Sequence, residues 1–131
     1  MMRAAGAATV FGAAALCFSV APNVAAMELL GQAGVLGEWE FTGNLVEEGA
    51  GARKEFSGRL KMTHVGICSV DGPEERAGEI RLRLLGSQSR LTANLVLDGV
   101  PCSYSARKTH AYEGTMSCTG REPVPLLLWL R

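Results

Sequence analysis

The stretch RLTANLVLDGVPCSYSARKTHAYEGTMSC, residues 90–118, decides the fold of this chain. In residues 91–97, leucine or alanine occupies every second position, which is the period of a half-buried strand and not of a helix. Asp98-Gly99 follows directly and favours the type I′ turn that joins two antiparallel strands. The turn predicts three cross-strand pairs on one face: Leu97 with Val100, Leu95 with Cys102 and Ala93 with Tyr104.

The cysteines in the second half of this stretch predict a disulfide. A turn near residues 107–110 brings Cys102 opposite Cys118 on the buried face, where a cross-strand bond is possible. A bond from Cys68 to either of them is the competing choice, because all three share the inner face. The sequence contains no C-x-x-C motif and no metal-binding pair. We therefore expect a structural disulfide, no redox centre and no metal site.

Most of the remaining chain shows the same two-residue rhythm. The alternating or continuously apolar segments lie at residues 35–44, 56–64, 80–85 and 124–130. Each adjacent pair can be joined through a short loop with its apolar faces on the same side. We predict a single all-β domain over residues 35–131, an antiparallel up-and-down meander of seven to eight strands, closed or nearly closed into a small barrel. Residues 27–34 are expected to form an N-terminal lead-in.

The first two segments contain oppositely charged residues that predict how they pair. A register with Trp39 opposite Leu60 keeps the large apolar side chains inside. On the outside, this register pairs two glutamates with two basic residues: Glu38 with Lys61 and Glu40 with Arg59. Because opposite charges stabilise cross-strand pairs, we expect this register and interpret these carboxylates as structural and not catalytic.

Residues 1–26 have the pattern of a secretory signal peptide. A short positive start at Arg3 precedes an apolar stretch, which ends in the small residues that a signal peptidase accepts. We expect cleavage before Met27 and a periplasmic or secreted protein with no stable membrane span. The alternatives are an uncleaved membrane anchor, since the apolar stretch approaches the length that spans a bilayer, and lipid attachment at Cys17.

The charge of the chain gives no support for a polyanionic partner. Cleavage leaves 131 less 26 residues, or 105, which is enough for one small domain. The remaining chain carries 12 basic residues, the total of 13 less Arg3, against 13 acidic ones, a formal charge of −1. We therefore expect no binding of nucleic acid. No local catalytic motif is present, so we also expect no enzyme activity and no cofactor.

Three side chains on the predicted inner face are candidates for ligand binding: His64, Tyr104 and Met116. A barrel of this size has an interior that side chains fill or that holds one small ligand. Four small inward residues would leave space beside the larger ones: Gly58, Ala93, Ala106 and Gly114. We expect a binding module for a small apolar molecule, with a filled core as the alternative.

The alternative function is a protein-binding envelope or inhibitory module whose core is filled. Leu127 and Trp129 in the last apolar segment, together with Leu85, would then form an interface on the outer face. The same residues make a homodimer worth considering. A basic stripe on the outside would add to such an interface: Arg59, Lys61, Arg81 and Arg83.

Gly37-Glu38-Trp39, at the start of a predicted barrel, resembles the G-x-W motif of lipocalins and other calycins. In that family the tryptophan packs at the closed end of the barrel, so the resemblance implies a calycin-like shape. The chain is shorter than most lipocalins and lacks their usual C-terminal helix. Small periplasmic inhibitors of metalloproteases are also similar in shape, although their cysteine arrangement is not found here. Shape alone does not transfer function.

Overall fold

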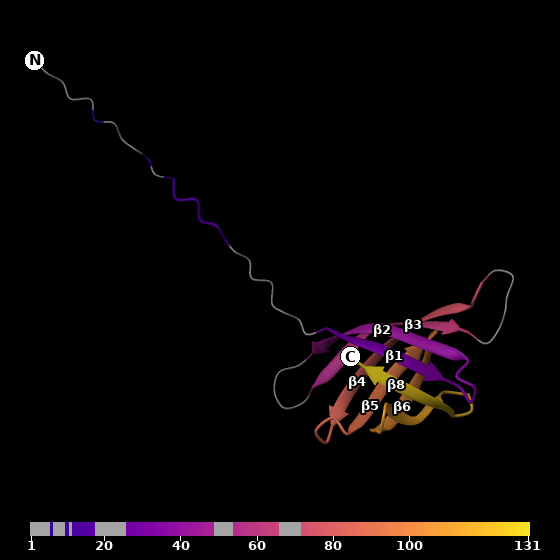
Figure 1. Cartoon of the computed structure of the whole chain (residues 1–131). Helices are drawn as coiled ribbons and strands as arrows, with labels where there is room; N and C mark the ends of the chain where they lie inside the picture. The colour runs from indigo at the N-terminus through magenta and orange to yellow at the C-terminus, as the bar shows by residue number, and fades with distance from the viewer. Residues whose placement is uncertain (1–5, 7–9, 11, 18–25, 49–53, 66–71) are drawn as a thin grey trace, which may run out of the picture.

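The computed structural model describes residues 6, 10, 12–17, 26–48, 54–65 and 72–131. The described part contains eight antiparallel strands that follow one another around a closed barrel (Figure 1). The strands are β1 (Ala26–Ala33), β2 (Trp39–Glu48), β3 (Glu55–His64), β4 (Glu75–Leu85), β5 (Arg90–Leu97), β6 (Val100–Lys108), β7 (Tyr112–Cys118) and β8 (Val124–Leu130). In these residues no helix is long and apolar enough to cross a membrane.

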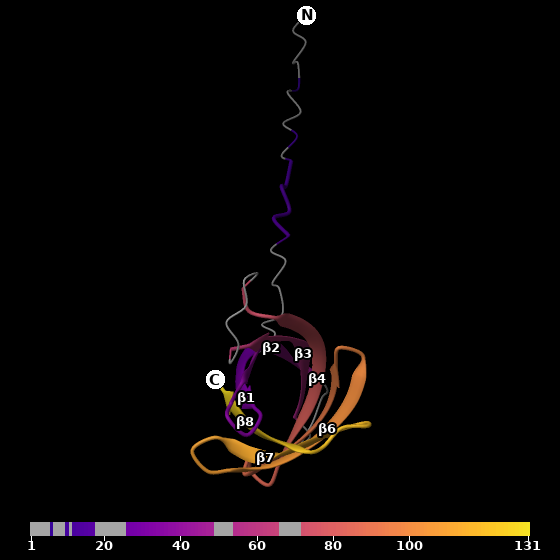
Figure 2. The same ribbon diagram turned by 90° about the vertical axis from the view of Figure 1, so that its right-hand side faces the viewer.

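The barrel closes because its first and last strands pair with each other (Figure 2). β1 lies between β2 and β8, with Leu30 opposite Thr42 on one side and opposite Trp129 on the other. Closure leaves no free sheet edge among the described strands, and so removes a template for aggregation. The predicted up-and-down barrel is therefore confirmed, with eight strands.

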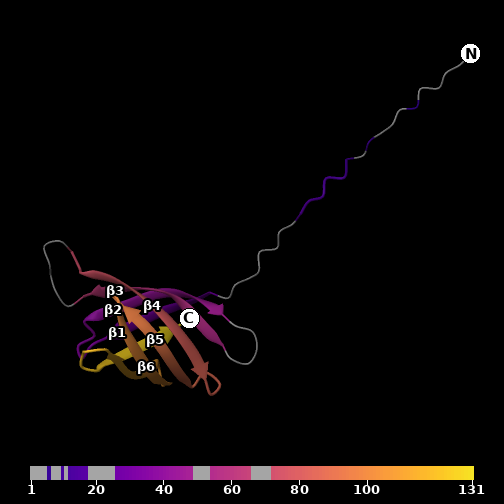
Figure 3. The same ribbon diagram turned by 180° about the vertical axis from the view of Figure 1, so that it is seen from behind.

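Alternate residues of the strands point inward and form one apolar core. The pattern is clearest in β5, where Leu91, Ala93 and Leu95 are buried and the residues between them are exposed. Figure 3 shows β4, β5 and β6 side by side at the back of the barrel, and each of them contributes to this core. The largest fully buried side chains are all leucines: Leu29, Leu45, Leu82, Leu91, Leu95, Leu126 and Leu128.

The hairpin predicted at Asp98-Gly99 is confirmed. Asp98 and Gly99 have φ angles of 50° and 80°, and a type I′ turn requires positive φ at both positions. Leu97 lies opposite Val100, and the pairing continues along β5 and β6 in the predicted register.

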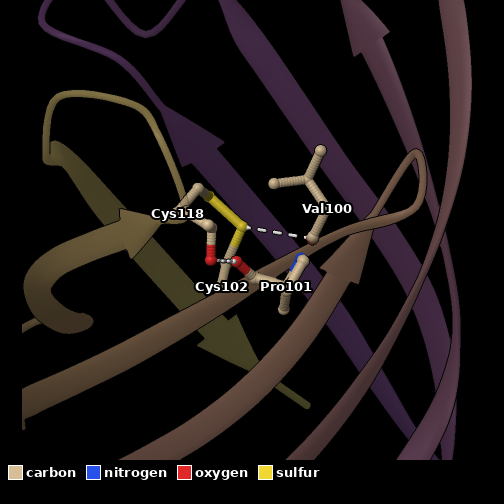
Figure 4. Close-up of a disulfide and its surroundings, with 5 residues drawn as sticks. Val100, Pro101, Cys102 and Cys118 are labelled. Carbon is tan, nitrogen blue, oxygen red and sulfur yellow. Dashed lines mark hydrogen bonds between the residues drawn. A yellow bond between two sulfur atoms is a disulfide. The ribbon is translucent and has the colours of Figure 1, made fainter.

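The predicted disulfide is present in the structure. Cys102 of β6 lies directly opposite Cys118 of β7, with 4.0 Å between their Cα atoms, and a bond joins their sulfur atoms (Figure 4). Cys68, the competing partner, lies outside the described residues.

The prediction for residues 27–34 is wrong, because this segment forms most of β1 and not a lead-in. Two features conceal its strand pattern. Two of its inward positions hold Gly31 and Ala33, which contribute little apolar surface, and Leu30 faces outward against Trp129. The strand is stabilised by pairing with β2 and β8, which a local pattern does not reveal.

The predicted start of the next strand at Val35 is also wrong. Val35 and Leu36 form the turn between β1 and β2. Gly34 and Gly37 flank them with φ angles of 97° and 63°, which glycine adopts readily. The N–H of Gly37 donates to the carbonyl oxygen of Gly34 at 3.1 Å and closes the turn.

The predicted register between β2 and β3 is wrong by four residues. Trp39 lies opposite His64 and not opposite Leu60. A shift of four residues keeps every side chain on its own face, so the inward and outward pattern does not distinguish the two registers. Lys61 forms its 3.0 Å ion pair with Glu75 of β4 and not with a residue of β2.

Candidate functional site

A cavity of about 210 Å³ opens at the end of the barrel where β1 ends and β2 begins. We call this end the mouth, and Figure 2 looks along the barrel from it. The apolar side chains around the cavity are Ala33, Trp39, Phe41, Met62, Leu97, Val100, Met116 and Val124. The charged residues at its rim are Glu38, Arg76, Asp98, Arg121 and Glu122. The cavity therefore combines an apolar interior with a polar entrance.

The disulfide forms part of the cavity wall. The sulfur of Cys102 lies 3.6 Å from the carbonyl oxygen of Val100 (Figure 4), and this is a packing contact because a disulfide sulfur carries no hydrogen. Beside it, the N–H of Thr119 donates to the carbonyl oxygen of Pro101 at 3.1 Å. A covalent bond and a backbone hydrogen bond thus fix β6 against β7 at the mouth.

Trp39 and Arg76 meet at the rim of the cavity. The guanidinium carbon of Arg76 lies 5.8 Å from the centre of the Trp39 ring, within the range of a cation–π contact. Arg76 also donates to the carboxylate of Asp98 at 3.0 Å and to that of Glu74. The hydrogen bond and the charge of Glu74 raise the pKa of Arg76. These contacts hold a cation against the indole ring at the entrance.

Sequence reasoning did not identify Arg76 and Asp98 as site residues. Asp98 is part of a hairpin turn, and Arg76 lies in a charged segment that reads as a loop. The alternation of β4 is the signal that could have identified Arg76. The even-numbered residues of this strand point inward, as the buried Ile80 and Leu82 show. Extending this parity toward the start of the strand places Arg76 over the barrel interior.

Only one of the three predicted ligand-binding residues, Met116, lines the cavity. His64 packs on Trp39 in a T-shaped arrangement, with 4.6 Å between the ring centres, and is not part of the lining. Its buried Nδ1 atom has no hydrogen-bond partner among the described residues. His64 therefore supports a wall residue of the cavity and does not face the space itself.

Tyr104, the third predicted residue, fills the core. Its hydroxyl lies 2.9 Å from the carbonyl oxygen of Tyr112 and 2.7 Å from that of Leu126. Burial, with a smaller contribution from the charge of Glu113, raises the pKa of Tyr104, so the hydroxyl stays protonated and donates. Nearer the opposite end of the barrel, the Tyr112 hydroxyl donates to the carbonyl oxygen of Gln88 at 2.7 Å. The two tyrosines occupy the interior away from the mouth.

The three predicted interface residues do not form one patch. Leu127 and Trp129 lie half-buried on the outer face of β8, and Leu30 of β1 lies opposite Trp129. Leu85 is exposed at the end of β4, four strands away around the barrel. We define the outer patch as Leu30, Leu127 and Trp129.

The predicted basic stripe is partly neutralised by carboxylates. Arg81 and Arg83 have guanidinium nitrogens 3.8 Å and 3.9 Å from the carboxylate of Glu55. Lys61 pairs with Glu75, as described above. Because the basic groups are exposed and have acidic neighbours, this face is a solvated sheet surface.

No protein-family model matches the chain, and no curated protein and no solved structure matches it significantly. The G-x-W segment also departs from the calycin arrangement, because Trp39 opens the second strand and lines a cavity. The structure thus shows the fold class of the protein but does not assign the protein to a known family. It is a small, closed, eight-stranded antiparallel barrel with a cross-strand disulfide and an apolar cavity at one end.

Proposed function

We propose that the protein is an exported binding module, secreted or periplasmic, that holds a small apolar molecule in the cavity at the mouth. The observation that carries this proposal is the apolar lining, which includes Trp39, Phe41 and Met116, beneath a charged rim. Ligand sites are typically concave and mostly apolar, with a few polar groups that fix orientation. The disulfide supports export, because such bonds persist in oxidising compartments. The proposed role is binding, without catalysis or a cofactor.

The volume of the cavity limits the size of the ligand. An apolar cavity of about 150 Å³ is large enough to bind benzene. A cavity of about 210 Å³ therefore accommodates one aromatic ring with a small substituent, or a short alkyl chain. A larger ligand would extend past Arg76 and Asp98 into solvent, where its polar end would meet their charges.

Trp39 gives a direct measure of binding, since it is one of only two tryptophans in the chain. In a Trp129→Phe background, we expect titration with toluene or 1-hexanol to change the Trp39 emission saturably. Val100→Phe should fill the cavity from its wall and weaken binding at least about tenfold, or about 1.4 kcal/mol. Val96→Phe adds the same side chain on the exposed outer face and is the matched control. A lack of saturable binding, or equal binding by the two phenylalanine variants, would contradict the proposal.

The outer patch supports a second candidate function, which is binding of a protein partner or a second copy of the chain. Leu30, Leu127 and Trp129 bring large apolar side chains together on adjacent strands, and such patches mark interfaces. If the patch forms a homodimer, the protein should sediment as a dimer and Trp129→Ser should sediment as a monomer. A monomer at all concentrations would remove the homodimer from consideration.

A further inference from the structure

The turn between β1 and β2 presents two aliphatic side chains to solvent beside the mouth. Val35 is 83% exposed and Leu36 is 90% exposed. Val65, at the end of β3, is 48% exposed, and its N–H donates to the carbonyl oxygen of Glu38 at 2.8 Å. This hydrogen bond places Val65 next to the turn. We define Val35, Leu36 and Val65 as the apolar rim.

Two local hydrogen bonds brace the backbone of the turn. The N–H of Gly37 donates to the carbonyl oxygen of Gly34 at 3.1 Å, and the N–H of Leu36 donates to the carboxylate of Glu38 at 3.0 Å. An ordered protrusion loses less conformational entropy on docking than a flexible loop does. Val35 and Leu36 are therefore already positioned at the surface before a partner binds.

Among the described residues, the size and charge of this end of the barrel favour a lipid surface as the partner. Three aliphatic side chains cover far less than the roughly 800 Å² that each partner contributes to a stable protein interface. A lipid surface, in contrast, accepts a small apolar protrusion without a matching contour. Of the described residues, those at the cavity rim include three carboxylates, of Glu38, Asp98 and Glu122, and two guanidinium groups. This balance does not attract anionic lipids, so a zwitterionic surface fits better.

We propose that the apolar rim docks the barrel, mouth first, on a zwitterionic lipid surface. Val35 and Leu36 enter the interfacial layer of the lipid, and Val65 lies at its edge. The mouth then lies against the lipid, and an apolar molecule can pass from the lipid to the cavity with little exposure to water. Docking goes beyond the proposed ligand binding. It does not depend on ligand binding, because the three residues of the apolar rim do not line the cavity.

Flotation of the purified protein with phosphatidylcholine vesicles tests the docking. We expect part of the wild-type protein to float with the vesicles. The double substitution Val35→Ser with Leu36→Ser should lower the partition coefficient at least about tenfold, because it removes most of the exposed apolar surface of the rim. The matched control is Leu85→Ser with Val96→Ser, which removes exposed aliphatic side chains elsewhere and should leave flotation unchanged.

A second measurement places the turn in the lipid. Leu36→Trp, in a chain with Trp39→Phe and Trp129→Phe, should show a blue shift of its emission when phosphatidylcholine vesicles are added. The Val100→Phe variant should still float, which separates docking from ligand binding. The proposal is overturned if the wild-type protein does not float, if the double serine variant floats equally well, or if only anionic phosphatidylglycerol vesicles bind. Self-association that is lost in the double serine variant would also overturn it, because the rim would then be a protein contact.

Discussion

The hydroxyl of Tyr104 lies 2.7 Å from the carbonyl oxygen of Leu126, which joins the inner face of β6 to the backbone of β8. The same hydroxyl is 2.9 Å from the carbonyl oxygen of Tyr112 in β7, so one buried proton is shared between two acceptors. β8 is also the strand that closes the barrel against β1. Tyr104 of β6 therefore connects the closing strand β8 to the hairpins formed by β5, β6 and β7.

Tyr104→Phe should destabilise the protein by about 1–3 kcal/mol, because it removes a buried donor from two carbonyl oxygens. Tyr112→Phe is the matched control. Its hydroxyl bonds to Gln88 in a turn where water can replace it, so we expect a loss of about 0.5–1.5 kcal/mol. Urea unfolding of both variants gives the comparison. A smaller loss for Tyr104→Phe than for Tyr112→Phe would show that the buried hydroxyl does not stabilise β8.

The stability of the protein should fall as the pH rises above about 10. Burial raises the folded-state pKa of Tyr104 above its ordinary value of 10.0, so the unfolded chain loses this proton first. The unfolded state then binds fewer protons than the folded state, and the free energy of unfolding decreases with pH. Burial also raises the pKa of Tyr112, which contributes in the same direction.

Tyr104→Phe should make this alkaline loss of stability smaller. The test is the urea midpoint of both proteins as the pH is raised from about 8 to about 11, across the ordinary tyrosine pKa. Absorbance of tyrosinate, recorded in parallel, should show a tyrosine that ionises only on unfolding in the wild-type protein. Identical pH dependence in the two proteins would contradict the assignment of this effect to Tyr104.

Removal of the disulfide through Cys102→Ala with Cys118→Ala should lower the free energy of unfolding by about 3 kcal/mol in the chain-entropy model, since the bond spans 16 residues. A reductant should destabilise the wild-type protein by a similar amount and leave the double variant unchanged. Peptide mapping without reduction should recover Cys102 linked to Cys118 and should find Cys68 open to alkylation after unfolding. A linked peptide that contains Cys68 would refute this pairing.

The parts of the fold that the sequence predicted correctly are those in which a short turn fixes the register. The two-residue turn at Asp98-Gly99 fixes the register between β5 and β6, so the inward-facing residues and their cross-strand partners could both be predicted. Between β2 and β3 the connection is longer, and a shift of four residues leaves the same side chains inside. β1 was missed because it pairs with β8, the last strand of the chain, for example through Leu30 and Trp129, and no local pattern encodes such a contact.

The candidate site was harder to predict than the fold. Alternation predicts that Tyr104 and Met116 point inward, and both do. Alternation does not predict where along the barrel axis a cavity remains, because this position depends on the register of all eight strands. Met116 therefore lines the cavity, whereas Tyr104, its cross-strand neighbour, fills the core. The cavity residue Arg76 was missed for a different reason: the predicted strand began at residue 80, whereas β4 begins at Glu75 and so includes Arg76.

Gly114 illustrates how a small inward residue serves packing and does not create ligand space. A Cβ atom at Gly114 would meet the backbone carbonyl of Ser105 on the neighbouring strand β6. Because a backbone atom moves only with its strand, Gly114→Ala should destabilise the protein by about 1–3 kcal/mol. Gly99→Asn is the matched control, since a side chain there meets nothing within 4 Å and asparagine tolerates positive φ. Its free energy of unfolding, measured with urea, should stay within about 0.5 kcal/mol of that of the wild-type protein. If Gly114→Ala proves as stable as Gly99→Asn, the close approach of β6 and β7 at this position does not constrain the fold.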